Sequence, residues 1–133
     1  MCLRRTYTRY LKKHRKYTEK YLKERETMVQ RFGEMIKAKD LEAYKKWHAA
    51  PMPGVNEMIR ECHLKNYSIY SRGDYLFAYY EYDGDNFEAD MAKMAADPAT
   101  QAWWDVVKPL MRPLDDRKEG EFWSGMEEIY HLD

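Results

Sequence analysis

Apolar residues recur along this chain with two different periods, which divide it into strands and helices. Four segments alternate apolar and polar residues or carry short apolar runs, as strands do; they span residues 28–37, 64–70, 75–82 and 126–132. Four others repeat apolar residues every three to four positions, as helices do; they span residues 41–48, 54–62, 87–95 and 98–107. The predicted order is therefore β-α-α-β-β-α-α-β, with residues 114–125 as a loop.

Residues that favour turns and helix starts lie between these segments. Gly73, in Ser71-Arg72-Gly73-Asp74, supplies the positive φ of a tight turn between two strands. Gly33 predicts either a bulge or a close approach of another segment. Pro53 can serve as the first residue of the second helix. Carboxylates that can cap a helix precede the other three helices: Asp40, Asp85 (with Glu88 in a capping box) and Asp97.

Merging the two helix pairs gives the order βαββαβ, the ferredoxin-like split arrangement. It predicts an α+β fold with helices on one face of an antiparallel sheet. The strand at residues 75–82 is aromatic or apolar on both faces, whereas a strand with a solvated face alternates with polar residues. A second subunit would cover the other face. We therefore predict a homodimer, a dimeric α/β-barrel with its pocket on the side that the helices leave uncovered.

Length and composition indicate a small globular enzyme or binding domain. The chain has 133 residues, 44% of them apolar, and its 12 Tyr and 4 Trp are ample for a core. It has neither a run of 18 apolar residues nor an apolar N-terminal stretch, so we predict no membrane span and no signal peptide. Cys2 and Cys62 are too few for a disulfide framework, which favours reduced thiols and a cytoplasmic location.

Charge divides the chain into two parts. Residues 1–27 hold ten Lys and Arg against three Glu, a net of +7, and residues 28–133 carry a net of −7. We predict that residues 1–27 form a basic helical extension and residues 28–133 the functional domain. Lys23-Glu24-Arg25-Glu26 can be encoded by a purine tract like that of a ribosome-binding site, so we hypothesise that Met28 is the natural start.

Two groups of side chains carry candidate chemistry. Tyr44 and His48 share one helix face, one turn apart. A hydroxyl beside an imidazole suits proton transfer on a polar substrate. Such pairs also occur as half-buried helix faces without a catalytic role. Trp103 and Trp104 point about 100° apart on a helix, which predicts one indole in the core and one beside a pocket. An indole suits the C–H face of a sugar, and Tyr67 could supply a hydroxyl.

Metal and cofactor sites are not predicted. The four histidines are scattered, and none lies at ligand spacing from cysteines or carboxylates; they are His14, His48, His63 and His131. The sequence also has no glycine-rich phosphate loop and no serine nucleophile elbow.

Several stretches together resemble the L-rhamnose mutarotase family over residues 28–133. They are Glu42-Ala-Tyr44-Lys-Lys-Trp-His48, Asn66-Tyr67-Ser-Ile-Tyr70, Tyr75-Leu-Phe-Ala-Tyr79, Asp90-Met-Ala-Lys-Met-Ala-Ala-Asp97-Pro98, Trp103-Trp104 and Met126-Glu-Glu-Ile-Tyr-His-Leu-Asp133. The resemblance implies a dimeric α+β barrel that interconverts the α and β anomers of L-rhamnose without a cofactor.

The resemblance also assigns roles to residues of this chain. His48 matches the family's proton donor, and the substrate-contacting positions match Tyr44, Tyr67, Trp103 and Trp104. One departure concerns the sugar: where the family usually has Trp-Pro after the histidine, this chain has Met52-Pro53. Two other functions stay open, namely another small enzyme on a dimeric α/β-barrel, such as an oxygenase, and a nucleic-acid-binding module using the basic extension.

Overall fold

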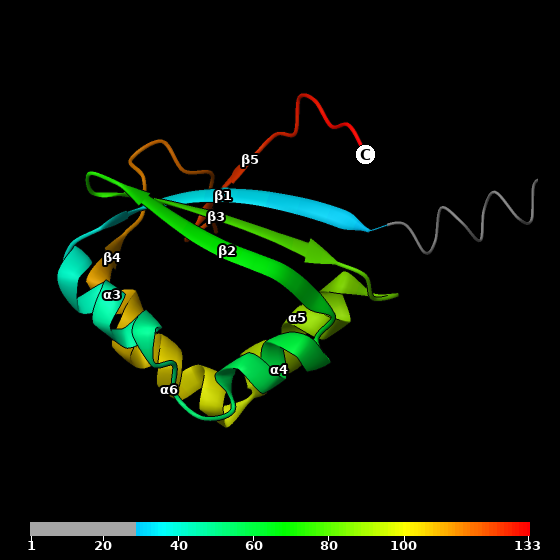
Figure 1. Ribbon diagram of the computed structural model, residues 1–133, viewed down its shortest axis with the longest axis horizontal. Coiled ribbons are helices and arrows are strands. Elements are labelled where there is room, and N and C mark those ends of the chain that lie inside the picture. The colour runs from blue at the N-terminus through cyan, green and yellow to red at the C-terminus, as the bar shows by residue number, and fades with distance from the viewer. Residues whose placement is uncertain (1–28) are drawn as a thin grey trace, which may run out of the picture.

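The computed structural model describes residues 29–133 (Figure 1). The basic extension and the hypothetical start at Met28 lie outside the described residues. The five strands are β1 (Gln30–Ala38), β2 (Leu64–Arg72), β3 (Tyr75–Tyr82), β4 (Met111–Arg112) and β5 (Ser124–Met126). The helices of residues 29–133 are α3 (Leu41–Ala49), α4 (Val55–Glu61), α5 (Phe87–Ala96) and α6 (Pro98–Val107), and a short 3₁₀ helix spans Lys108–Leu110.

The strands form one curled antiparallel sheet in the order β2-β3-β1-β4, and β5 also pairs with β1. This order and the placement of all four helices beneath one face of the sheet confirm the predicted α+β fold with the split βαββαβ arrangement (Figure 1). Among the described residues, no helix is long and apolar enough to cross a membrane.

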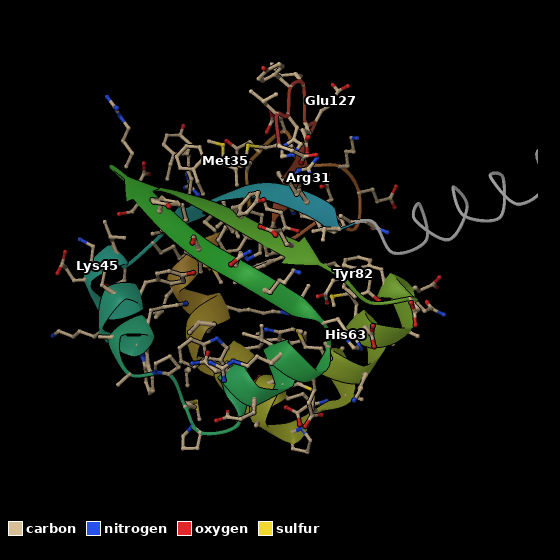
Figure 2. All side chains as sticks on the ribbon, turned by 45° about the vertical axis from the view of Figure 1, so that its right-hand side comes forward. Arg31, Met35, Lys45, His63, Tyr82 and Glu127 are labelled. Carbon is tan, nitrogen blue, oxygen red and sulfur yellow. The ribbon has the colours of Figure 1, made fainter. Side chains whose placement is uncertain are left out.

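The last strand differs from the prediction. Its place beside β1 is taken by two short strands, β4 and β5, and residues 127–133 form no strand. Past Met126 the chain contacts β1 through side chains, because Arg31 Nε and Nη2 donate to both carboxylate oxygens of Glu128 at 3.1 and 2.9 Å. Figure 2 shows Arg31 on the side of β1 that faces away from the helices.

The glycine and turn predictions have mixed outcomes. Gly73 has φ +59° and closes the β2–β3 turn as expected. Gly33 marks a close approach, since a Cβ there would lie 3.3 Å from Met126 Cε. Pro53 lies in the turn before α4, because Gly54 takes the left-handed conformation at φ +88° and the helix begins one residue later.

Three of the helices begin on side-chain caps. Asp40 and Asp97 cap α3 and α6 as predicted, by accepting from the backbone N–H groups of Ala43 and Thr100 at 3.0 and 2.9 Å. For α5 the prediction of Asp85 was wrong. Asn86 is the cap and accepts from the Ala89 N–H at 3.1 Å, since the helix starts one residue later than the capping-box pattern placed it.

The core lies between the sheet and the helices in two adjoining clusters. One is built on β1 and β3 with α3 and α6, around Ile36 and Leu76, which are 0% and 1% exposed. The other lies at the opposite end of the sheet, around Tyr80 and Tyr82 of β3. Trp104 packs against both clusters. The helices thus pack mainly on the two central strands, which leaves the edge strand β2 less covered.

Candidate active site

The site begins with the Tyr44–His48 pair on α3. Tyr44 is buried and His48 half-buried, and their rings stack with centroids 4.0 Å apart, as the helical spacing predicts. His48 Nδ1 lies 2.7 Å from the backbone oxygen of Tyr44. A carbonyl can only accept, so Nδ1 carries the hydrogen and the neutral ring keeps its lone pair on Nε2. The fold thereby fixes the tautomer of a potential acid–base catalyst.

The surroundings of His48 favour its neutral form. Burial lowers the pKa of His48 below its usual value near 6.5, and the hydrogen bond to the Tyr44 carbonyl offsets part of that shift. Trp103 of α6, which is 8% exposed, contacts the imidazole edge-on with centroids 5.0 Å apart. The ring is therefore held by Tyr44 and Trp103 together.

A cavity of about 670 Å³ opens in front of these groups. It contains three of the predicted site residues, His48, Tyr67 and Trp103. The rest of its lining comes from α4 and β2 and includes polar groups for which the sequence analysis gave no signal: Asn56, Arg60, Lys65 and Asn66, with Ile59, Leu64 and Ile69. Such a volume suits a small molecule.

The cavity does not lie on the side of the sheet where the pocket was predicted. It lies between β2 and the helices α3, α4 and α6, and so on the helix-covered side of the sheet. The prediction placed the pocket on the side that the helices leave uncovered. The helices pack mainly on β1 and β3, and the space beneath the edge strand stays open.

Tyr44 lines a second, adjoining cavity of about 300 Å³, which shares His48 and Ile69 with the first. Trp104 lines neither cavity. Its half-buried ring packs against the core, and the ammonium of Lys108 lies 4.4 Å from the ring centroid, whereas Trp103 is both a buried core residue and part of the cavity wall. The structure therefore brings His48, Tyr44, Tyr67 and Trp103 together around the two cavities, and Trp104 lines neither of them.

Tyr67 is the polar group that faces the site from the sheet. Its ring stacks on Tyr80 with centroids 5.1 Å apart, and the Tyr80 hydroxyl donates to Glu34 Oε1 at 2.7 Å. Burial raises the pKa of Tyr67, and the nearby Glu34 charge raises it further. Burial likewise raises the pKa of Tyr44. Both phenols are therefore neutral hydroxyl donors at physiological pH.

These groups suit proton transfer to and from a small polar ligand. The imidazole of His48, the phenol of Tyr67 and the amide of Asn56 line the first cavity, with the Trp103 indole as a flat apolar wall, and Tyr44 lines the second cavity. Within residues 29–133, no three His, Cys, Asp or Glu side chains lie close enough to hold a metal ion.

Comparison with known proteins points to the same chemistry. The family model for L-rhamnose mutarotase matches residues 31–132. An L-rhamnose mutarotase of Phocaeicola vulgatus is 32% identical over 92 residues, covering 68% of this chain and 84% of that protein. A UPF0734 protein of Dictyostelium discoideum is 31% identical over 106 residues, covering 75% and 85%.

The fold agrees with a solved structure. The crystal structure of an L-rhamnose mutarotase from Formosa agariphila superimposes with a TM-score of 0.60 at 20% identity, covering 78% of this chain and 99% of that one. At this identity the likeness concerns the fold alone. The family match extends over most of the chain, and the chain therefore belongs to the L-rhamnose mutarotase family, isomerases that interconvert sugar anomers.

Proposed function

We propose that this protein interconverts the α and β anomers of L-rhamnose or a related 6-deoxy sugar, and that His48 transfers the protons. The observation that carries the proposal is the free Nε2 of His48, which the Nδ1 hydrogen bond leaves available in a small-molecule cavity. Membership of the mutarotase family supplies the reaction class.

The chemistry needs only proton transfers. His48 takes the proton of the anomeric hydroxyl, the O–H electron pair forms the carbonyl, and the bond between the anomeric carbon and the ring oxygen breaks. The ring oxygen receives that bond's electron pair and a proton. After rotation, the same oxygen attacks the other carbonyl face and returns its proton to the group that supplied it. His48 gives its proton to the carbonyl oxygen, which becomes the new anomeric hydroxyl. No electron is gained or lost, so we expect no cofactor.

The other site residues would orient the sugar. Trp103 supplies a flat apolar surface for the C–H face of the ring, and the Tyr67 and Tyr44 hydroxyls face the two cavities as donors. Either phenol could protonate the ring oxygen. Trp104 packs against both core clusters and lines neither cavity. Met52 also lines neither cavity and packs against the core, so its replacement of the family's usual Trp would act on the sugar indirectly.

Saturation-transfer NMR on L-rhamnose tests the reaction. Saturating one anomeric proton should reduce the signal of the other much faster with enzyme than without. General acid–base transfer contributes about 10²–10⁴-fold, so His48→Ala should lower kcat by at least about 10²-fold.

A second His→Ala substitution, far from the cavity in the sequence, serves as the matched control. His131→Ala removes an exposed imidazole that pairs only locally with Asp133, and it should keep the wild-type rate. Full activity in His48→Ala would remove His48 from the mechanism. Exchange with L-fucose but not L-rhamnose would keep the mechanism and change the substrate. Wild-type enzyme inactive on all pyranoses would refute the proposed function.

We also propose that the protein works as a homodimer in the cytoplasm. The uncovered sheet face carries Phe77 and Tyr79 half-buried, and the adjoining C-terminal segment exposes Ile129, Tyr130 and Leu132 at 90, 78 and 77%. A second copy would bury these apolar groups. Sedimentation equilibrium should give a dimer mass for wild type and a shift towards monomer for Ile129→Asp. A monomeric wild-type protein would contradict this.

A further inference from the structure

Strand β2 contains one more residue than its pairing with β3 requires, and this residue lies next to the site. Leu64 pairs with Tyr82 and Lys65 with Glu81, but the next pair is Ser68 with Tyr79. Between these pairs, Asn66 and Tyr67 of β2 lie opposite the single residue Tyr80 of β3. Two residues opposite one define a β-bulge. Bulges of this kind often redirect a side chain beside an active site.

The extra residue decides which way Tyr67 points. Leu64 and Ile69 are five residues apart, and in an uninterrupted strand they would face opposite sides of the sheet. Here both line the cavity on the helix-covered side, together with Tyr67. If β2 had no bulge and Leu64 stayed in the core, Tyr67 would face away from His48. The bulge is therefore the structural reason that this hydroxyl reaches the cavity.

Asn66 forms the bulge in a conformation that few residues adopt. Its φ is +48°, in the left-handed region, which asparagine tolerates better than most non-glycine residues. Its side-chain Nδ2 lies 3.0 Å from both carboxylate oxygens of Glu81. The Tyr79 hydroxyl also donates to Glu81 Oε2, at 3.1 Å. The neighbouring strand β3 thus holds Asn66 through the Glu81 carboxylate, and Tyr79 of the same strand holds that carboxylate.

Asn66 belongs to the cavity lining, but its amide is turned to Glu81, on the face of the sheet opposite the site. Side chains alternate along β3, and Leu76, Ala78, Tyr80 and Tyr82 are its buried, helix-side residues. Glu81 therefore lies on the uncovered face, where it cannot touch a ligand in the cavity.

We infer that the Asn66–Glu81 pair is a positioning device, which holds the bulge and so directs Tyr67 into the cavity from the far side of the sheet. The inference rests on the proposed function where it assigns Tyr67 to the sugar. Neither Asn66 nor Glu81 takes part in the proton transfers. Their effect is to fix one wall of the site.

Exchanging the donor and the acceptor tests the pair. Asn66→Asp sets two carboxylates against each other, and a coupled pair of this kind changes affinity by about tenfold. We expect KM for L-rhamnose to rise about tenfold with kcat within about twofold, because His48 is untouched. The double variant Asn66→Asp/Glu81→Gln restores an amide–carboxylate pair and should return KM to near the wild-type value.

NMR signals of the Tyr67 ring report its position without an activity measurement. The Tyr67 ring signals of ¹³C-tyrosine-labelled protein carry the ring-current shift of Tyr80, and Tyr67→Phe assigns them. Asn66→Asp should move these signals and the double variant should restore them. Lys93→Gln, which removes a surface ion pair with Glu61 at 3.5 Å, is the matched control and should leave both KM and the signals unchanged.

The outcomes separate the two proposals. Unmoved Tyr67 signals in Asn66→Asp, or a double variant no closer to wild type than the single one, would overturn the positioning role. A wild-type protein that leaves sugar anomers unaffected would refute the proposed function, and the NMR signals alone would then decide the inference about Asn66.

Discussion

Removing the Tyr80 hydroxyl should destabilise the protein in a pH-dependent way. Glu34 lies beneath the sheet, and burial raises the pKa of its carboxyl above 4.5. The hydrogen bond from Tyr80, at 2.7 Å, works in the opposite direction and lowers that pKa. Tyr80→Phe removes this donor but keeps the ring that stacks on Tyr67. The variant therefore separates the hydrogen bond from the cavity wall.

The sign follows from the direction of the shift. A carboxyl whose pKa is raised by folding binds protons more tightly in the folded state than in the unfolded state. Its contribution to the free energy of unfolding is therefore complete below pH 4.5 and is lost as the pH rises through the folded-state pKa. The Tyr80 hydroxyl limits that loss by stabilising the carboxylate. At pH 8, Tyr80→Phe removes a hydrogen bond to a charged group, about 1.5–3 kcal/mol; at pH 4 it removes a neutral one, about 0.5–1.5 kcal/mol.

Urea unfolding at both pH values measures the difference. We expect the free energy of unfolding of Tyr80→Phe to fall further below wild type at pH 8 than at pH 4. Lys93→Gln is the control, because it removes only a surface ion pair with Glu61 and should change stability by less than about 0.5 kcal/mol at either pH. Equal losses for Tyr80→Phe at both pH values would refute the role of the Glu34 charge.

Three further predictions follow from the site and its supports. The pKa of His48 is lowered, so kcat/KM should have an acid limb below pH 6.5 as neutral imidazole is lost, and a rate that rises in acid would contradict the base role. Trp103→Phe should raise KM for the sugar, whereas Trp104→Phe should lower the melting temperature and leave KM unchanged, because only the first indole lines the cavity. Gly84→Ala should cost about 1–3 kcal/mol of stability in urea unfolding, since overpacking a close contact has that magnitude. Its Cβ would lie 2.6 Å from Tyr82 Cζ, and a wild-type unfolding midpoint would show that the turn can relax.

Features set by local rules could be predicted from the sequence. The face shared by Tyr44 and His48 depends only on helical periodicity, and a stacked pair is observed. The caps at Asp40 and Asp97 likewise depend on a few neighbouring residues. The cap of α5 was misplaced by one residue, because Asp85 and Asn86 are both good caps and the tertiary structure decides between them.

Features set by tertiary packing could not be predicted in the same way. The alternation from Leu64 to Tyr70 reads as an unbroken strand, and the bulge becomes necessary only because Leu64 and Ile69 both face the helices. The alternation in residues 126–132 was equally strand-like, but side-chain pairing of Glu128 with Arg31 replaces the backbone ladder past Met126.

Both faces of β3 are apolar or aromatic, and the structure gives the two faces different surroundings. Tyr75, Phe77 and Tyr79 mark the uncovered face, which the helices do not reach and where we propose the partner subunit. The cavity lies on the other face with His48. In the proposals made above, chemistry and assembly use opposite faces of one sheet. The Asn66–Glu81 contact would connect them, since Glu81 lies on the uncovered face and Asn66 precedes Tyr67 of the site. Substitutions on the uncovered face that spare this pair should change the oligomeric state without changing KM per subunit.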